Sequence, residues 1–322
     1  MALPPFWPES DVFEQIEMVR VATRSVSVYK EPNDQSQIVA TWPRDSLLNV
    51  YETVNSGTPE YNPIWYRVFG GYMHRARLQR VRFHLNKPAE SIPETKQLGE
   101  MTVPFVQPYR YTASDGWQPV PFRLYYSTIH WVMATEEGPD RKPWYRLLDE
   151  ADDNLQYHVP AAYMRLIPPE EIAPISPEVA NKWIDVNLRE QSLTCYENDS
   201  PVYHATVSTG LRYLYDTPTG RFHIMVKLPS RRMNAADRAA GDDENVLAGV
   251  PWCSFFTDQG HAFHGTYWHD NFGMTMSHGC VNMVNEDAKW LFRWTRPVAA
   301  FEDIDKRTLA VQGYGTRVEI HY

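Results

Sequence analysis

The stretch from His261 to Met283 reads HAFHGTYWHDNFGMTMSHGCVNM and carries most of the chemical information in the chain. Its cysteine, Cys280, directly follows a glycine, and the stretch also holds four histidines: His261, His264, His269 and His278. Only a few per cent of a free thiol is ionised at neutral pH, but a neighbouring imidazole can accept its proton. The stretch therefore predicts a cysteine nucleophile that is activated by a histidine.

The residues beside the cysteine suit acyl transfer. That reaction needs a nucleophile, a base that later acts as an acid, and N–H donors for the tetrahedral oxyanion. Gly279 lacks a side chain, so it permits a tight backbone approach next to Cys280 and leaves N–H groups accessible. The four histidines could instead be imagined as a metal cluster. A zinc ion would occupy the base, and no acidic residue stands at a ligand-like spacing, so we expect no metal and no other cofactor.

Four separated segments resemble one known family. His264-Gly265-Thr266 and Ser277-His278-Gly279-Cys280-Val281-Asn282 look like the signature of the L,D-transpeptidases, also called the YkuD family. Val207-Ser208-Thr209-Gly210 and residues 217–224 (TPTGRFHI) are similar to two further segments of that family. The resemblance covers roughly residues 181–322, and it implies a catalytic domain of the β-sandwich type.

The resemblance also implies a role for each matching residue. Cys280 corresponds to the nucleophile, and His264 to the general base, with its other ring nitrogen held by a nearby backbone carbonyl. His278 would orient the site or support the oxyanion. The N–H groups of Gly279 and Cys280 are candidates for the oxyanion hole, and Ser277 would support the turn.

Three further residues are weaker candidates for the substrate cleft. Asn282 stands where many relatives carry arginine, and both residues occur in the family. Tyr267 and Trp268 follow the expected base closely in the sequence. They could line the cleft or simply pack in the interior, and the sequence leaves both readings open.

The reaction that the resemblance implies has two steps. Cys280 attacks the bond between a diamino acid and the terminal D-alanine of a peptidoglycan stem, and D-alanine leaves. An amine of a neighbouring stem then takes the acyl group from the thioester, which gives a 3→3 cross-link. Water or an envelope protein could accept it instead, which would make a carboxypeptidase or an anchoring enzyme. Acylation of Cys280 by carbapenem-type β-lactams is implied as well.

Two other readings compete with this one. A sortase-like transpeptidase also places its histidine before its cysteine, and it needs an arginine, for which Arg293 and Arg317 are available. The alternative that is not an enzyme is a wall-binding protein whose catalytic domain is inactive. The Ser-His-Gly-Cys context argues against the first reading, and the intact pair of Cys280 and His264 argues against the second.

The rest of the chain predicts a multidomain, mainly β protein with one or two short helices. Its 322 residues exceed what one compact core usually holds, and 19 Tyr and 25 Pro favour short strands and firm loops. Short strands at 17–82 resemble a bacterial Src-homology-3-like barrel. Residues 98–170 repeat a Trp-Tyr-Arg motif and predict a second such barrel or another small β domain. The catalytic domain is expected at 181–322.

Within this last domain, three local patterns predict structure. Ser192 to Val207 reads as a hairpin that turns at Asn198-Asp199. Residues 286–294 have the pattern of a helix, and residues 230–246 read as a solvated loop or lid because large apolar side chains are scarce there.

The composition of the chain narrows the classes of binding partner. The net charge of −9 and the absence of a basic stripe disfavour nucleic acid, and no apolar run approaches the ~18 residues of a membrane span. Peptidoglycan stem peptides are the expected partner, and the sequence carries no signal of oligomeric state. Because this substrate lies outside the cytoplasmic membrane, we expect a location in the cell envelope, either periplasmic or extracellular. The N-terminus MALPPFWPES lacks the pattern of an export signal.

Overall fold

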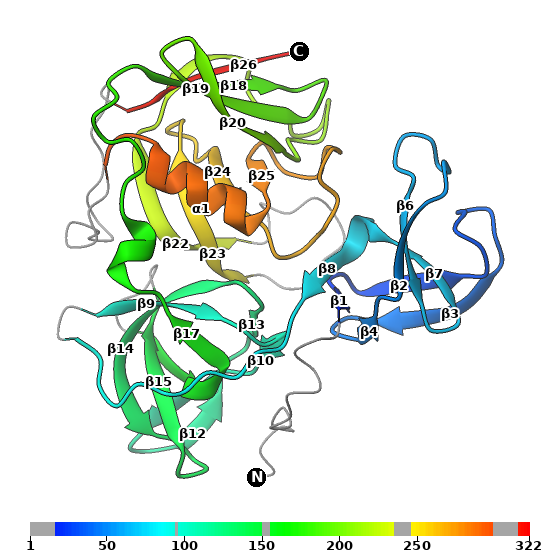
Figure 1. Cartoon of the computed structure of the whole chain (residues 1–322). Helices are drawn as coiled ribbons and strands as arrows, with labels where there is room; N and C mark the ends of the chain where they lie inside the picture. The colour runs from blue at the N-terminus through cyan, green and yellow to red at the C-terminus, as the bar shows by residue number, and fades with distance from the viewer. Residues whose placement is uncertain (1–16, 94–95, 150–154, 235–245, 299–314) are drawn as a thin grey trace. The chain divides into compact units, whose positions relative to one another are not determined.

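The computed structural model describes residues 17–93, 96–149, 155–234, 246–298 and 315–322. It divides into two compact units. Of the described residues, those within 17–166 and Tyr267–Asp270 belong to the first unit, and those within 167–234, 246–266 and 271–322 belong to the second. Strands dominate both units, and the described residues contain a single α-helix (Figure 1). The expectation of a mainly β protein is therefore confirmed.

The N-terminal part of the first unit forms two small sheets. One has the strand order β4-β1-β8 and the other the order β3-β2-β7-β6-β5. The strands are β1 (Met18–Val21), β2 (Ser25–Tyr29), β3 (Ile38–Pro43), β4 (Leu47–Asn49), β5 (Glu52–Asn55), β6 (Ile64–Val68), β7 (Gly71–His74) and β8 (Leu78–Val81). Buried side chains from both sheets, among them Val19, Val28 and Met73, pack into one core cluster.

The remainder of the first unit is built on a seven-stranded antiparallel sheet with the order β12-β11-β16-β15-β14-β9-β17, beside the short pair β10-β13. The strands are β9 (Gln97–Met101), β10 (Phe105–Val106), β11 (Tyr109–Thr112), β12 (Gly116–Pro119), β13 (Leu124–Tyr125), β14 (Ile129–Glu137), β15 (Pro143–Leu148), β16 (Gln156–Pro160) and β17 (Met164–Leu166). The wide sheet buries aromatic side chains such as Trp144 and Tyr157.

One succession of elements occurs twice in the first unit. Trp65-Tyr66-Arg67 lies in β6, and Trp144-Tyr145-Arg146 lies in β15. Each strand is followed by its hairpin partner, a 3₁₀ turn (Arg75–Arg77 or Ala161–Tyr163) and one more strand. Both tryptophans are buried. This agreement favours a duplication, while the Src-homology-3-like assignment and the domain boundaries stay predictions.

The second unit contains a five-stranded sheet with the order β20-β19-β18-β26-β21. The strands are β18 (Lys182–Asn187), β19 (Ser192–Glu197), β20 (Ser200–Thr206), β21 (Gly220–His223) and β26 (Arg317–His321). β19 and β20 form the predicted hairpin, which is confirmed, with Asn198 at a φ of 57° in the turn. Asparagine tolerates this left-handed conformation better than most residues do. β26 returns from the end of the chain to pair with β18 in parallel.

The other sheet of the second unit has the order β22-β23-β24-β25. Its strands are β22 (Val226–Asn234), β23 (Val246–Phe255), β24 (Ala262–Gly265) and β25 (Val281–Met283). The helix α1 (Asn285–Trp294) follows β25 almost directly and packs against β23 and β24 (Figure 1). The predicted helix is thus confirmed. No helix in the described part of the chain has the length and apolar character needed to cross a membrane.

Buried lysines from both sheets hold the C-terminal end of α1. Lys182 on β18 donates to the carbonyl of Trp294 at 2.9 Å, and Lys227 on β22 donates to the carbonyl of Thr295 at 2.8 Å. The last carbonyls of a helix have no partner within it, and they attract positive charge. The two lysines therefore tie the end of the helix to both sheets of the second unit.

The prediction of a solvated loop at residues 230–246 is wrong for its first part. Residues 230–234 belong to β22 and pair with β23, and Ser230 is buried. The polar side chains Ser230, Arg231 and Arg232 hide this strand from a reading based on apolar residues. Residues 235–245 lie outside the described residues.

Candidate active site

Cys280 lies at the end of a tight turn that begins at Ser277. The hydroxyl of Ser277 donates to the Cys280 carbonyl at 2.5 Å and accepts from the Gly279 N–H at 3.1 Å. Gly279 has a φ of 110°, in the region that favours glycine. The hydroxyl of Ser277 therefore closes the turn, and the Gly279 N–H is engaged within it.

The thiol of Cys280 differs from the other two in the chain. All three cysteines are free, but Cys195 and Cys253 are buried, whereas Cys280 is partly exposed. Burial raises the pKa of the Cys195 thiol well above its usual range. The sulfur of Cys280 lies 3.8 Å from the Gly260 carbonyl oxygen. Only the thiol of Cys280 is open to a substrate.

Strand register brings the strand of His264 next to the segment that holds the cysteine. β24 and β25 run parallel, with Phe263 opposite Val281 and His264 opposite Asn282. Alternate residues of a strand face the same side, and neighbouring strands lie about 4.8 Å apart. Cys280 lies in the bend directly before β25, two residues before Asn282, so this register brings the segment that holds Cys280 next to β24.

The surroundings of His264 define its chemistry. Its Nδ1 lies 3.0 Å from the Gly265 carbonyl oxygen, as the sequence led us to expect. A carbonyl only accepts, so Nδ1 carries the proton and Nε2 is the basic nitrogen. Burial lowers the pKa of His264 to about 4, and the contact with Gly265 opposes this only in part. The imidazole is therefore uncharged at neutral pH and able to accept a proton.

His278 packs on an exposed loop of residues 211–215, which carries two tyrosines. Its ring lies edge-on to Tyr215, with ring centroids 3.7 Å apart. Its Nδ1 is buried and has no hydrogen-bond partner among the described residues. The loop is tied to the cysteine turn, because the Leu211 N–H donates to the Ser277 carbonyl at 2.9 Å. Tyr213, Leu214 and Tyr215 of this loop are exposed.

His261 lies on the other side of the turn. A methyl group built on Gly279 would stand 2.6 Å from Cδ2 of His261, 2.7 Å from its Nε2, and 3.4 Å from the carbonyl oxygen of Asp216. Gly279 is therefore enclosed between a histidine ring and a loop backbone. We had weighed His261 only as a metal ligand, because nothing in its spacing indicates contact with Gly279. Tyr215 was missed because it falls between two segments of the family signature.

The structure does not favour the weaker cleft candidates. Tyr267 and Trp268 are buried, and the ring of Tyr267 stacks on Tyr125 within the first unit. Buried rings of this kind do not form the wall of a cleft, so the packing interpretation is the better one. Asn282 is also buried, and its backbone exchanges two hydrogen bonds with Ser208, at 2.8 and 2.9 Å. Its observed role is to join the Ser208 segment to β25.

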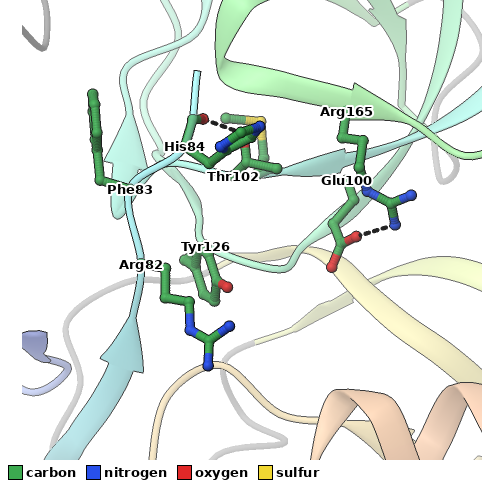
Figure 2. Close-up of a pocket in the computed structure, with 8 residues that line it drawn as sticks. Arg82, Phe83, His84, Glu100, Thr102, Tyr126 and Arg165 are labelled. Atoms are coloured by element: carbon green, nitrogen blue, oxygen red, sulfur yellow. Dashed lines mark hydrogen bonds and ion pairs between the residues drawn. The ribbon is translucent and has the colours of Figure 1, made fainter. Parts of the chain in front are cut away.

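A separate pocket of about 320 Å³ lies in the first unit (Figure 2). It is lined by Arg82, Phe83, His84, Glu100, Met101, Thr102, Tyr126 and Arg165. Arg165 pairs with Glu100 at 2.8 Å, and the Thr102 hydroxyl donates to the His84 carbonyl at 2.7 Å. The lining holds no cysteine, and the hydroxyl of Thr102 already donates to a carbonyl. The Cys280 site is therefore the candidate active site.

Comparison with known proteins identifies the domain that holds this site. A sequence model of the YkuD family, described as the L,D-transpeptidase catalytic domain, matches residues 181–320. Residues 181–320 are an L,D-transpeptidase catalytic domain. The L,D-transpeptidase match includes His264, the turn at Ser277 and Cys280, and both sheets of the second unit.

Individual L,D-transpeptidases match parts of the chain. YciB of Bacillus subtilis strain 168, whose name assigns it to the L,D-transpeptidases, is 28% identical over 127 residues, which are 36% of this chain and 63% of YciB. A solved L,D-transpeptidase of Xylanimonas cellulosilytica is 20% identical with a TM-score of 0.32, over 46% of this chain and 64% of that one. L,D-transpeptidase 3 of Mycobacterium tuberculosis is 15% identical with a TM-score of 0.34, over 67% and 79%. The chain thus covers less than two thirds of the first two proteins.

Proposed function

We propose that the protein is a peptidoglycan L,D-transpeptidase that works through a thioester on Cys280. The observation that supports this proposal is the parallel register of β24 and β25, which pairs the buried, uncharged His264 with Asn282, two residues after the partly exposed thiol of Cys280. The family of the domain supports the same reaction class. The substrate is the tetrapeptide stem, and the catalytic pair is Cys280 and His264.

In the first step, the sulfur of Cys280 attacks the carbonyl that precedes the terminal D-alanine of the stem. A C–S bond forms while the thiol proton passes to Nε2 of His264. The tetrahedral oxyanion then collapses, the C–N bond breaks, and His264 returns the proton to the leaving amine of D-alanine. Burial suits His264 to this work, because a neutral imidazole can begin as a base.

In the second step, an amine on a neighbouring stem attacks the thioester and releases the thiol. The product is a 3→3 cross-link. Water at the same point would give an L,D-carboxypeptidase, and an amine of an envelope protein would give an anchoring enzyme. Any of these reactions would place the protein outside the cytoplasmic membrane, where the peptidoglycan lies.

Other residues hold this site in position. Ser277 shapes the turn, and His278 supports it from the side of Tyr215. The Cys280 N–H is the backbone donor that we assign to the oxyanion. The Gly279 N–H, the other backbone candidate, is not included because it donates to Ser277.

The sortase-like alternative loses support from the positions of its arginines. Arg293 lies on α1 and donates to the Ala173 carbonyl at 2.9 Å. Arg317 lies on β26 of the other sheet, with its guanidinium 3.6 Å from the carboxylate of Glu319. Both side chains have partners away from the cysteine turn, so neither is a candidate for an arginine that acts on the substrate.

Two assays test the proposal. The first is intact mass spectrometry after incubation of the full chain with a carbapenem, where we expect one stable adduct on Cys280. The second is incubation with purified disaccharide-tetrapeptide, where we expect release of D-alanine together with cross-linked dimers. D-Alanine release without dimers would identify a carboxypeptidase. The absence of both adduct and D-alanine release would contradict an L,D-transpeptidase.

A further inference from the structure

The ring of His261 lies against Gly279 in the cysteine turn. The edge formed by Cδ2 and Nε2 faces Gly279, so closely that a side chain at position 279 would overlap it. His261 is partly exposed, and it belongs to the turn that joins β23 to β24. Its Nε2 thus stands beside Gly279, the residue that precedes Cys280.

The position of this ring is fixed by short contacts. Nδ1 of His261 lies 2.8 Å from the hydroxyl oxygen of Thr257, and the same oxygen accepts from the His261 backbone N–H at 3.0 Å. The Phe256 N–H donates to the His261 carbonyl at 2.9 Å, and the Phe256 ring stacks on the imidazole. These contacts hold the ring rigidly, as a group that acts on a developing charge must be held.

The contacts of the ring permit a proton on Nε2. The Thr257 hydroxyl can donate to Nδ1 of His261 or accept from it, and we take it as the donor because its oxygen already accepts from the His261 backbone N–H. A neutral ring with Nδ1 as acceptor carries its proton on Nε2. Burial lowers the pKa of His261, which favours this neutral form. The edge beside Gly279 therefore presents an N–H donor.

An N–H donor beside Gly279 could stabilise the oxyanion that forms in the reaction. Tetrahedral oxyanions are commonly stabilised by more than one N–H group. In this turn the Gly279 N–H donates to Ser277, which leaves room for a donor from another residue. The geometry points to Nε2–H of His261 as a donor to the oxyanion that forms at Cys280, together with the Cys280 N–H. This inference rests on the proposed function, and it makes His261 a catalytic residue distinct from the base.

The test compares two reactions of the same thiol. Acylation by a carbapenem passes through an oxyanion, whereas alkylation by iodoacetamide needs the thiolate but forms no oxyanion. We expect His261→Ala to lower the acylation rate about 100-fold, the usual effect of removing one oxyanion donor, and to leave the alkylation rate unchanged. His261→Gln retains an N–H donor and should recover part of the acylation rate. His264→Ala should slow both reactions.

Controls separate this inference from the proposed function. His204→Ala changes an exposed histidine of the same unit, bonded to Thr194 at 3.0 Å, and should alter neither rate. Thr257→Val keeps the ring but removes its hydroxyl partner, and should slow acylation several-fold even if His261→Ala folds poorly. Undiminished acylation in both variants, or equal losses in acylation and alkylation, would overturn the role of His261 alone. A wild-type protein that alkylates but never acylates would overturn the proposed function and this inference with it.

Discussion

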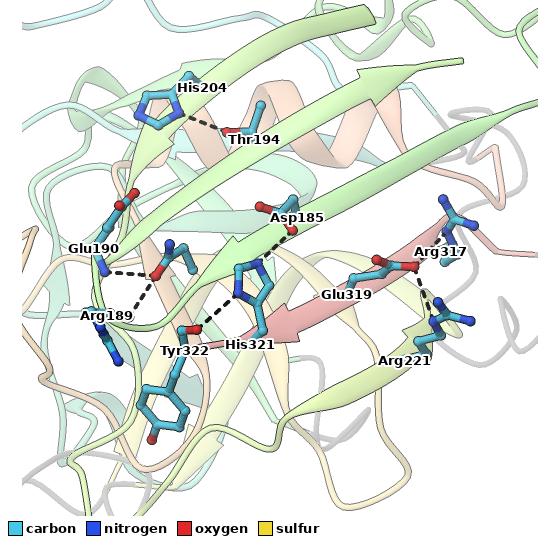
Figure 3. Close-up of polar contacts among 11 residues, drawn as sticks. Asp185, Arg189, Glu190, Thr194, His204, Arg221, Arg317, Glu319, His321 and Tyr322 are labelled. Carbon is cyan, nitrogen blue, oxygen red and sulfur yellow. Dashed lines mark hydrogen bonds and ion pairs between the residues drawn. The ribbon is translucent and has the colours of Figure 1, made fainter. Parts of the chain in front are cut away.

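The two sheets of the second unit come from one stretch of chain but place their polar residues differently. In the five-stranded sheet, β18 alternates buried and partly exposed residues, and the outer face carries charged pairs such as Asp185 with His321 (Figure 3). In the four-stranded sheet, β24 and β25 are buried at every position. Outer-face polar residues of the five-stranded sheet contact water, whereas Lys182 of β18 is buried at the end of α1. In the four-stranded sheet, β22 carries several polar residues, and His264 is the one polar residue of β24.

This difference explains where the chemistry lies. Burial from both faces removes water from around His264 and keeps it uncharged, whereas the histidines of the outer face are solvated. A buried polar group is costly unless it is bonded, so its presence in a sheet is informative. Changes in the four-stranded sheet should therefore affect acylation, and changes on the outer face of the five-stranded sheet should not.

The largest effect on carbapenem acylation is expected from substitution of Cys280. Cys280→Ala should abolish the carbapenem adduct completely, since it removes the attacking sulfur. Cys195→Ala, in β19 of the five-stranded sheet, should keep the adduct at the wild-type rate. Intact mass spectrometry of both variants provides the measurement. An adduct that persists in Cys280→Ala would end the assignment of the nucleophile.

The next effect concerns the base. His264→Gln should slow acylation about a thousandfold, within the range that general-base catalysis contributes. Glutamine keeps an N–H that can face the Gly265 carbonyl, so the fold should hold. Stopped-flow fluorescence during carbapenem acylation gives the rate, and circular dichroism checks the fold. Equal rates in variant and wild type would remove His264 from the mechanism.

The pH dependence of acylation should reflect the burial of His264. The base acts when it is unprotonated, and its lowered pKa of about 4 keeps it unprotonated down to mildly acidic pH. The acylation rate should therefore fall only as the pH drops toward 4, and not near 6.5. A rate profile from pH 4 to 8 measures this. A midpoint at 6.5 would show that burial does not lower the pKa of His264.

A smaller effect, on stability, should follow from loss of a helix-capping lysine. Lys227→Met keeps much of the aliphatic chain near the Phe292 ring but leaves the carbonyls of Thr295 and Pro297 without this donor. We expect a loss of about 2 kcal/mol in the free energy of unfolding. Lys289→Met, which removes a partly exposed pair with Glu171, should cost less than about 1 kcal/mol. Urea unfolding of both variants would compare them, and equal losses would contradict the capping role.

The contrast between the sheets also explains what the sequence could predict. Alternation of apolar and polar residues predicted β18 and β19, and the motif around Cys280 predicts the nucleophile and base that we propose, because those signals are local along the chain. β22 was missed at residues 230–234, since its polar side chains pair with β23 without an apolar pattern. His261 was missed because its contact with Gly279 depends on how two turns meet, which no spacing along the chain records.

The smallest effect should come from the outer face of the five-stranded sheet. His321 lies 2.9 Å from the carboxylate of Asp185, and this hydrogen bond raises the pKa of His321. A raised pKa in the folded state stabilises the fold below the unfolded value of about 6.5. That contribution disappears as the pH rises through the folded pKa. His321→Gln should therefore lower the free energy of unfolding by less than about 1 kcal/mol at pH 5.5 and by nothing at pH 9. The rate at which a carbapenem acylates the His321→Gln variant should equal the wild-type rate at both pH values. A clear loss of acylation would mean that the outer face of the five-stranded sheet takes part in the reaction.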